Sequence, residues 1–157
     1  MLTQLYKKWI SLLCLLLTMN VSAVVPKKPV QKVNEKELTA AILVAEAAGE
    51  GTKGMKAVME VIRTRMKERH LSMYRVVTER NAFSCFNKYR NQPLSFIRIN
   101  KRHPSFVKAL WIVNNYFGKE LTKGSNYYHE KTVHPSWSAG EKPRVIIGRH
   151  LFFALIN

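Results

Sequence analysis

The sequence of 157 residues contains no aspartate, and all ten of its acidic residues are glutamates. This absence excludes catalytic triads and calcium loops that depend on aspartate, and it excludes the glutamate–aspartate pair of many retaining glycosidases. If a carboxylate performs chemistry in this protein, that carboxylate therefore belongs to a glutamate.

A long hydrophobic run is also missing. The apolar stretch near the start, residues 9–19, is shorter than the about 20 residues that a membrane-spanning helix requires. It follows Lys7 and Lys8 and precedes the short side chains of residues 21–23, an order that predicts a secretory signal peptide, residues 1–23. An uncleaved membrane anchor is the alternative. We expect an exported protein of the periplasm or cell wall, with no stable membrane span once the signal is cleaved.

Cysteine is scarce, because Cys14 lies within the predicted signal and only Cys85 remains in the mature chain. A single thiol excludes an internal disulfide and a structural zinc site built on cysteines. The five histidines show no close pair of metal ligands, so we expect no metal and no other cofactor. Residues 24–34, with two prolines and three lysines, are predicted to form a tether. Residues 35–157 are predicted to form one monomeric domain.

Positive charge is abundant, with 26 lysines and arginines against ten glutamates and a formal net charge of +16. Removal of the two lysines of the predicted signal leaves +14 on residues 24–157. A field of this strength favours a polyanionic partner. For an exported protein we expect anionic cell-envelope polymers and no nucleic acid, although a basic surface that only keeps the protein soluble is the simpler interpretation.

Apolar periodicity predicts two helices at the start of the domain. The first covers residues 35–48, with Asn34 as its N-cap. The second has Thr52 as its cap and runs to about His70. Its apolar stripe, interpreted as core, comprises Met55, Val58, Met59, Ile62 and Met66, and its polar face comprises Lys56, Glu60, Arg63, Lys67 and Glu68.

The second half of the chain mixes helix and strand signals. Residues 71–103 show one short helical turn, near 74–77, and then no period, which indicates a long loop. An apolar stripe preceded by a proline predicts a third helix over 104–117. Segments 126–129 and 144–153 are rich in β-branched and aromatic residues and predict a small antiparallel sheet. The fold class is therefore α+β, mainly helical with a small C-terminal antiparallel sheet.

Glu46 and Glu50 stand close together where the first predicted helix ends. Helical spacing places Glu46 in the last turn, beside the apolar stripe, where the helix dipole and partial burial both disfavour an ionised carboxylate. That setting suits a general acid near neutral pH. Glu50 follows in a turn flanked by glycines, where the backbone can approach a ligand closely. A surface glutamate at a helix end is the plain alternative, and spacing alone favours it.

Five segments, taken in order, resemble the cell-wall hydrolase family related to spore cortex-lytic enzymes. They are Val44–Arg65, which contains a Glu-Ala-Ala-Gly-Glu stretch, Asn81–Cys85, Asn126–His129, Pro135–Trp137 and Ile147–Phe153. The resemblance extends over about residues 39–153. It implies a lysozyme-like fold and cleavage of the glycan strands of peptidoglycan. It also implies that Glu46 is the catalytic acid and that Glu50 has a supporting catalytic role, and the reverse assignment of these two roles is the alternative.

Further side chains are candidates to bind the glycan, namely Phe83, Ser84, Tyr127, Tyr128, His129 and Trp137. Aromatic rings can stack on sugar rings, and His129 can hydrogen-bond the substrate or orient Glu46. Packing is the alternative for each aromatic residue, and strand alternation predicts that one of the two tyrosines is buried. The basic stretch 86–103 departs from the family pattern and is either an added wall-binding surface or a solvated loop.

The activity that the resemblance implies is that of a lytic transglycosylase, which cleaves the bond between N-acetylmuramic acid and N-acetylglucosamine. This reaction needs one carboxylate and no positioned water, so it suits a chain without aspartate better than a two-carboxylate hydrolase does. The alternatives are a hydrolase that uses Glu46 with Glu50, an N-acetylmuramoyl-L-alanine amidase, and a non-catalytic cationic module that binds the cell envelope.

Overall fold

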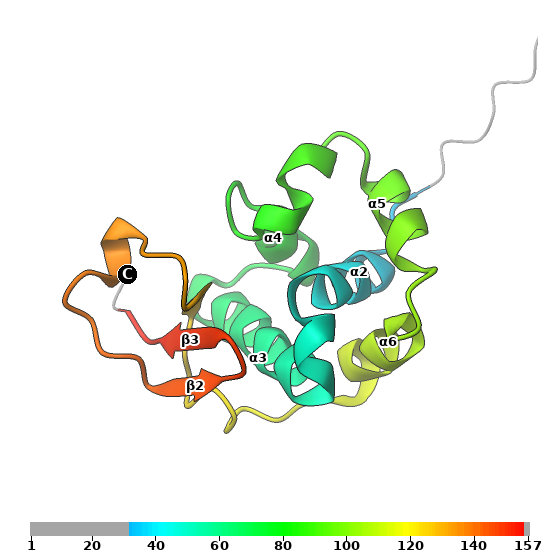
Figure 1. Ribbon diagram of the computed structural model, residues 1–157. Coiled ribbons are helices and arrows are strands. Elements are labelled where there is room, and N and C mark those ends of the chain that lie inside the picture. Colours follow the sequence, from blue (N-terminus) through cyan, green and yellow to red (C-terminus); the bar gives the residue numbers. More distant parts are fainter. Residues whose placement is uncertain (1–31, 156–157) are drawn as a thin grey trace, which may run out of the picture. The chain divides into compact units, whose positions relative to one another are not determined.

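The computed structural model describes residues 32–155 (Figure 1), and the predicted signal peptide, 1–23, lies outside the described residues, as does most of the predicted tether. The elements in chain order are α2 (Glu35–Ala47), the short 3-10 turn η1 (Ala48–Glu50), α3 (Gly51–Arg69), α4 (Met73–Thr78), η2 (Ser84–Tyr89), α5 (Pro93–Asn100), α6 (Phe106–Asn115), β1 (Tyr127–Glu130), η3 (Ser136–Ser138), β2 (Val145–Ile147) and β3 (His150–Phe153). The predicted class, mainly helical α+β with a small C-terminal antiparallel sheet, is confirmed. Within residues 32–155, no helix is long and apolar enough to cross a membrane.

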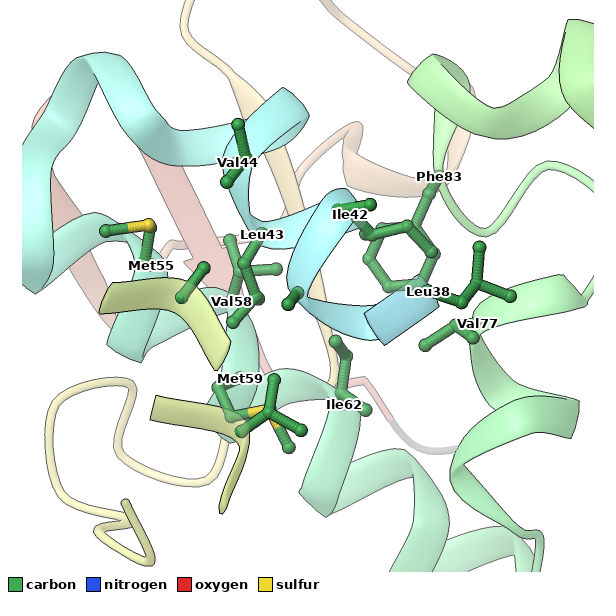
Figure 2. Close-up of a cluster of buried hydrophobic side chains, with 14 of the residues drawn as sticks. Leu38, Ile42, Leu43, Val44, Met55, Val58, Met59, Ile62, Val77 and Phe83 are labelled. Carbon is green, nitrogen blue, oxygen red and sulfur yellow. The ribbon is translucent and has the colours of Figure 1, made fainter. Parts of the chain in front are cut away.

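The central helix of the domain is α2, which contacts α3, α4, α5 and α6 (Figure 1). Every residue from Leu38 to Val44 is buried, and a helix that is buried on all sides lies inside a core. Figure 2 shows its side chains packed among those of α3, with Phe83 beside them. The predicted cap is confirmed, because Asn34 Oδ1 accepts the backbone N–H groups of Lys36 at 3.0 Å and Glu37 at 3.2 Å.

Helix α3 differs from its prediction at one end and on one face. It begins at Gly51, and Thr52 lies inside its first turn instead of capping it. The predicted methionine stripe is core, as expected, with Met55 and Met59 fully buried. The predicted polar face was wrong at Glu60, which is buried and accepts hydrogen bonds from groups beyond α6. These donors are Tyr116 Oη at 2.6 Å, Leu121 N at 3.3 Å, Thr122 N at 2.8 Å and Thr122 Oγ1 at 2.9 Å.

The segment predicted as a long loop contains two helical elements that the sequence pattern did not reveal. Besides α4, which matches the predicted turn, η2 and α5 lie within residues 71–103. Both are too short to display a period, and they are stabilised by burying a few large side chains, among them Phe86 and Phe96. Helix α6 begins at Phe106, two residues later than predicted. Phe117, the last member of its predicted stripe, is 69% exposed and lies under the Arg63 guanidinium.

The sheet is antiparallel with the strand order β1-β3-β2, and Tyr128 of β1 pairs with Phe152 of β3. The segment 144–153, predicted to contribute to the sheet, forms a hairpin of β2 and β3, because the chain turns at Gly148 with a φ of +58°. Residues Ala57 and Val61 of α3 pack against Ile147 and Phe152 of the sheet. This packing holds the hairpin near the junction of α2 and α3, where Glu46 and Glu50 lie.

Candidate active site

Glu46 lies where α2 passes from the core to the surface. The residues before Ala45 are buried, Ala45 is exposed, and the Glu46 side chain is half-buried against a cleft of about 440 Å³. One carboxylate oxygen, Oε2, accepts the hydroxyl of Tyr128 at 2.9 Å. The other, Oε1, accepts the backbone N–H of Cys85 at 3.4 Å. The carboxylate is thus oriented by β1 and by η2 while it remains on the wall of a cleft.

Both groups that contact Glu46 are neutral donors. Burial, together with the nearby Glu46 carboxylate, raises the pKa of Tyr128 well above its ordinary value. Burial and the same carboxylate also raise the pKa of the Cys85 thiol. The Tyr128 ring is stacked on Phe152 at 5.5 Å between centroids, which fixes the direction of its hydroxyl. Tyr128 therefore stays protonated and donates to Glu46 without bringing a charge to the cleft.

Glu50 is held in a different way, by a set of residues that we call the Glu50 clasp. It comprises Glu50, Gly54, Gly148, Arg149 and His150. Glu50 Oε2 lies 2.6 Å from His150 Nδ1, and Oε1 accepts the backbone N–H of Arg149 at 3.2 Å. The Glu50 side chain is only 8% exposed.

The two glycines of the Glu50 clasp make room for the glutamate. A Cβ added at Gly148 would lie 2.6 Å from Glu50 Cγ, and one added at Gly54 would lie 2.6 Å from Glu50 Cβ. Distances below 3.0 Å require something to move. The clasp therefore joins the start of α3 to the β2–β3 hairpin, and Glu50 is enclosed while its partner His150 faces the cleft.

Several of the predicted glycan-binding residues line the same cleft as Glu46. Ser84 lies exposed at the start of η2, and Tyr128, His129 and Trp137 complete the wall. The Trp137 ring packs on His129 at 5.4 Å and on Phe153 at 5.5 Å. His129 Nδ1 lies 2.9 Å from the Glu130 carbonyl, which can only accept, so Nδ1 carries the proton. His129 Nε2 is then an acceptor, and it has no hydrogen-bond partner among residues 32–155.

Two predicted site residues lie elsewhere. Phe83 is 2% exposed and belongs to the hydrophobic core, so it has no surface to offer a sugar ring. Tyr127 lies outside the Glu46 cleft and lines a smaller neighbouring pocket, where the Arg69 guanidinium donates to its hydroxyl at 3.3 Å. Tyr128, the next residue of β1, lines this pocket as well as the Glu46 cleft. Both tyrosines are half-buried, so the prediction that one of the two is buried was wrong.

The cleft also contains residues that were not predicted to belong to the site. His150, Arg149 and Glu130 lie on its wall, and Arg149 Nη1 is 3.5 Å from Glu130 Oε1. The one local signal in the sequence was Gly148, because a glycine in a strand segment indicates that another part of the chain approaches closely. In the structure this glycine has a positive φ. The partner in that approach, Glu50, is about a hundred residues earlier in the chain, and a single sequence does not reveal such a pair.

A roomier hollow of about 1070 Å³ lies along α3 and the loop after α6, and it contains none of the predicted site residues. Its one buried carboxylate, Glu60, already accepts several hydrogen bonds and is not available to a ligand. Among residues 32–155, no group of three or more histidine, cysteine or acidic side chains is placed to hold a metal ion. The Glu46 cleft is therefore the candidate active site.

The sequence model of the cell wall hydrolase family matches residues 49–153, about two thirds of the chain, and the protein belongs to this family. The predicted resemblance is thereby confirmed, and the protein is a cell wall hydrolase. The matched region includes Glu50, Tyr128 and His150 and begins three residues after Glu46. No curated protein and no solved structure matches the chain. The likeness to lysozyme therefore stays a prediction.

Proposed function

We propose that this protein cleaves the glycan strands of peptidoglycan as a lytic transglycosylase, with Glu46 as its catalytic acid and base. The observation that carries the proposal is the placement of Glu46. Its carboxylate lies on the wall of the 440 Å³ cleft and is oriented by two neutral donors, Tyr128 and the Cys85 backbone N–H. Such a carboxylate can give up and take back a proton without breaking an ion pair.

The proposed reaction balances on one carboxyl group. Protonated Glu46 donates its proton to the glycosidic oxygen, and the bond from that oxygen to C1 of N-acetylmuramic acid breaks. The C6 hydroxyl of the same sugar attacks C1, and its proton passes to the Glu46 carboxylate. The products are a 1,6-anhydro-muramic end and a free C4 hydroxyl on N-acetylglucosamine. No water is consumed, and Glu46 returns to its protonated form.

Glu50 is a poor candidate for the acid because the Glu50 clasp encloses it. Its side chain is 8% exposed, and both of its oxygens already have partners. We assign Glu50 the role of a positioning residue, which acts through His150 on the cleft wall. The ring of His150 in turn meets the Tyr128 ring edge-on at 5.1 Å.

A second candidate function follows from Glu130, which lines the same cleft. Glu46 and Glu130 together would make a two-carboxylate hydrolase, in which a water replaces the C6 hydroxyl as nucleophile. We favour the transglycosylase because it needs only Glu46, whereas Glu130 Oε1 lies 3.5 Å from Arg149 Nη1 and already takes part in an ion pair. In either case we propose that Ser84, His129 and Trp137 bind the sugar and that the protein reaches its substrate by export.

The test is digestion of purified sacculi followed by mass spectrometry of the released fragments. We expect 1,6-anhydro-muramic ends from the wild type and none from Glu46→Gln. Glu141→Gln, at an exposed loop position, is the matched control and should release them at the wild-type rate. Reducing muramic ends would identify the hydrolase, free stem peptides would identify an amidase, and salt-sensitive binding without any release would identify a cationic binding module.

A further inference from the structure

A smaller pocket of about 210 Å³ adjoins the Glu46 cleft, and we call it the arginine pocket. It is lined by Arg65, Arg69, Glu79, Arg80, Asn81, Ala82, Tyr127, Tyr128 and Trp137. Three arginines against one glutamate give these walls a formal charge of +2. Sugar rings are neutral, so an excess of positive charge in a pocket beside a glycan cleft needs another explanation.

Arg65 is the most unusual of these arginines, because it is only 6% exposed and no carboxylate of residues 32–155 forms an ion pair with it. Its Nε donates to the Asn126 carbonyl at 2.7 Å, and its guanidinium lies near the Tyr127 ring. Burial is the main cause that lowers the pKa of Arg65; the charge of Arg69 also lowers it, whereas Tyr128 and Glu79 act in the opposite direction. A buried guanidinium is normally compensated by an anion, and here the one carboxylate that acts on it, Glu79, forms its ion pair with Arg69 instead.

The other two arginines differ in how firmly they are held. Arg69 donates to Glu79 at 2.8 Å, which neutralises one of the three charges. Arg80 is exposed, and no ion pair or hydrogen bond of its side chain occurs among residues 32–155. Arg80 is therefore free to turn toward a bound anion, while Arg65 provides a fixed charge at the base of the same pocket.

The arginine pocket and the Glu46 cleft share part of their walls. Asn81, Ala82, Tyr128 and Trp137 line both. Tyr128 contacts Glu46 through its hydroxyl, so an anion in the arginine pocket would lie within one or two side chains of the proposed acid. A substrate that enters this pocket must therefore carry its negative charge close to the bond that is cleaved.

We infer that the arginine pocket binds a carboxylate of the peptide stem that the muramic sugar carries next to the cleaved bond. This inference rests on the proposed function. The stem is attached at C3 of the sugar whose C1 is attacked, so it leaves the ring beside the cleft. Guanidinium groups match a carboxylate by paired hydrogen bonds, which neutral sugar hydroxyls cannot replace. The protein thus selects glycan positions that still carry a stem.

The experiment compares two substrates made from one batch of glycan strands that have been freed of phosphate-containing polymers. One keeps its peptide stems. The other has lost them to an added amidase, and the lactyl carboxylate that this hydrolysis leaves on each muramic sugar has been capped as a neutral amide by carbodiimide coupling to methylamine. We expect Arg80→Gln to lower kcat/KM about threefold to tenfold on stem-bearing strands and less than about twofold on stem-free strands. Arg75→Gln removes an equal charge from α4, outside both pockets, and should lower the two rates equally or not at all.

A binding measurement keeps the inference testable whatever the reaction is. In a Glu46→Gln background, we expect stem-bearing strands to co-sediment more strongly than stem-free strands, and we expect Arg80→Gln to remove most of that difference. Arg69→Gln is a second variant with the same expectation. Equal effects of Arg80→Gln on both substrates would overturn the inference while leaving the transglycosylase proposal intact. Absence of any glycan cleavage would overturn the proposal, and the binding difference would then decide the inference alone.

Discussion

Glu46, at the end of α2, and Glu50, the last residue of the short turn η1, are four residues apart and lie in opposite environments. Glu46 faces a cleft and accepts hydrogen bonds from two neutral donors. Glu50 is enclosed, accepts a backbone N–H and pairs with His150 at 2.6 Å. The separation arises because the α-helical backbone breaks between them at Ala47, which has a φ of −140° and a ψ of 12°.

Under the proposed function, one short motif provides both the catalytic carboxylate and its support. A carboxylate that exchanges protons with a substrate needs access and donors that stay neutral, and Glu46 has both. A carboxylate that joins distant segments needs burial and fixed partners, as Glu50 has. The Glu50 clasp holds the hairpin that carries His150, and His150 packs against the tyrosine that orients Glu46.

The largest expected effect separates the two glutamates directly. We expect Glu46→Gln to lower kcat on sacculi by about 10²- to 10⁴-fold, because general acid catalysis contributes about that much, while the free energy of unfolding changes little. Glu50→Gln should keep most of the turnover and lose stability instead. Initial rates of anhydro-muropeptide release and thermal unfolding of both variants measure this. If Glu50→Gln abolishes turnover in a protein of unchanged stability, the two roles are reversed.

The next effect isolates the Glu50 clasp by comparing two glycines. Gly148 and Gly140 both have positive φ, +58° and +80°, so alanine strains the backbone at each. Only at Gly148 does the new Cβ meet Glu50, at 2.6 Å, whereas Gly140 has open space. We expect Gly148→Ala to destabilise the protein by about 1–3 kcal/mol more than Gly140→Ala, as measured by chemical denaturation. Equal losses would mean that the clasp is loose.

The secondary structure was predictable where the local sequence signals are strong. The first helix with its Asn34 cap, the methionine core of α3 and the sheet-forming segments were all predictable, because local propensity and period agree with the packing. The elements η2 and α5 were missed because they are short and are stabilised by tertiary burial instead of period. The loop prediction therefore failed where local signals are weakest.

The site was predictable only in part, for a related reason. The position of Glu46 at the end of α2 follows from helical spacing, but its partner Tyr128 is brought to it by strand pairing far along the chain. The burial of Phe83, the enclosure of Glu50 and the neighbouring arginine pocket depend on contacts between segments that have no shared period. Such contacts become visible only when the segments are placed in space.

A smaller effect concerns the donor to Glu46. Because the pKa of Tyr128 is raised above 10.0, the folded protein keeps a proton that the unfolded chain releases as the pH rises above about 10. Stability supported by the neutral phenol is therefore complete below that pH and is lost above it. Between pH 9 and pH 11 we expect the free energy of unfolding to fall by about 1 kcal/mol less in Tyr128→Phe than in the wild type. Tyr74→Phe, on the exposed side of α4, is the control, and an unchanged slope in Tyr128→Phe would contradict the raised pKa of Tyr128.

The smallest effect distinguishes the backbone of the Glu50 clasp from its surface charges. The Arg149 guanidinium lies 3.9 Å from Glu50 and 3.5 Å from Glu130, but its side chain is 73% exposed, so solvent screens both pairs. We expect Arg149→Ala to change the free energy of unfolding by less than about 0.5 kcal/mol, because its backbone N–H still donates to Glu50. Arg144→Ala, at an exposed position on the same hairpin, is the comparison. A loss above about 1.5 kcal/mol for Arg149→Ala alone would place the guanidinium among the groups that hold Glu50, and the clasp would then be partly electrostatic and weaken with added salt.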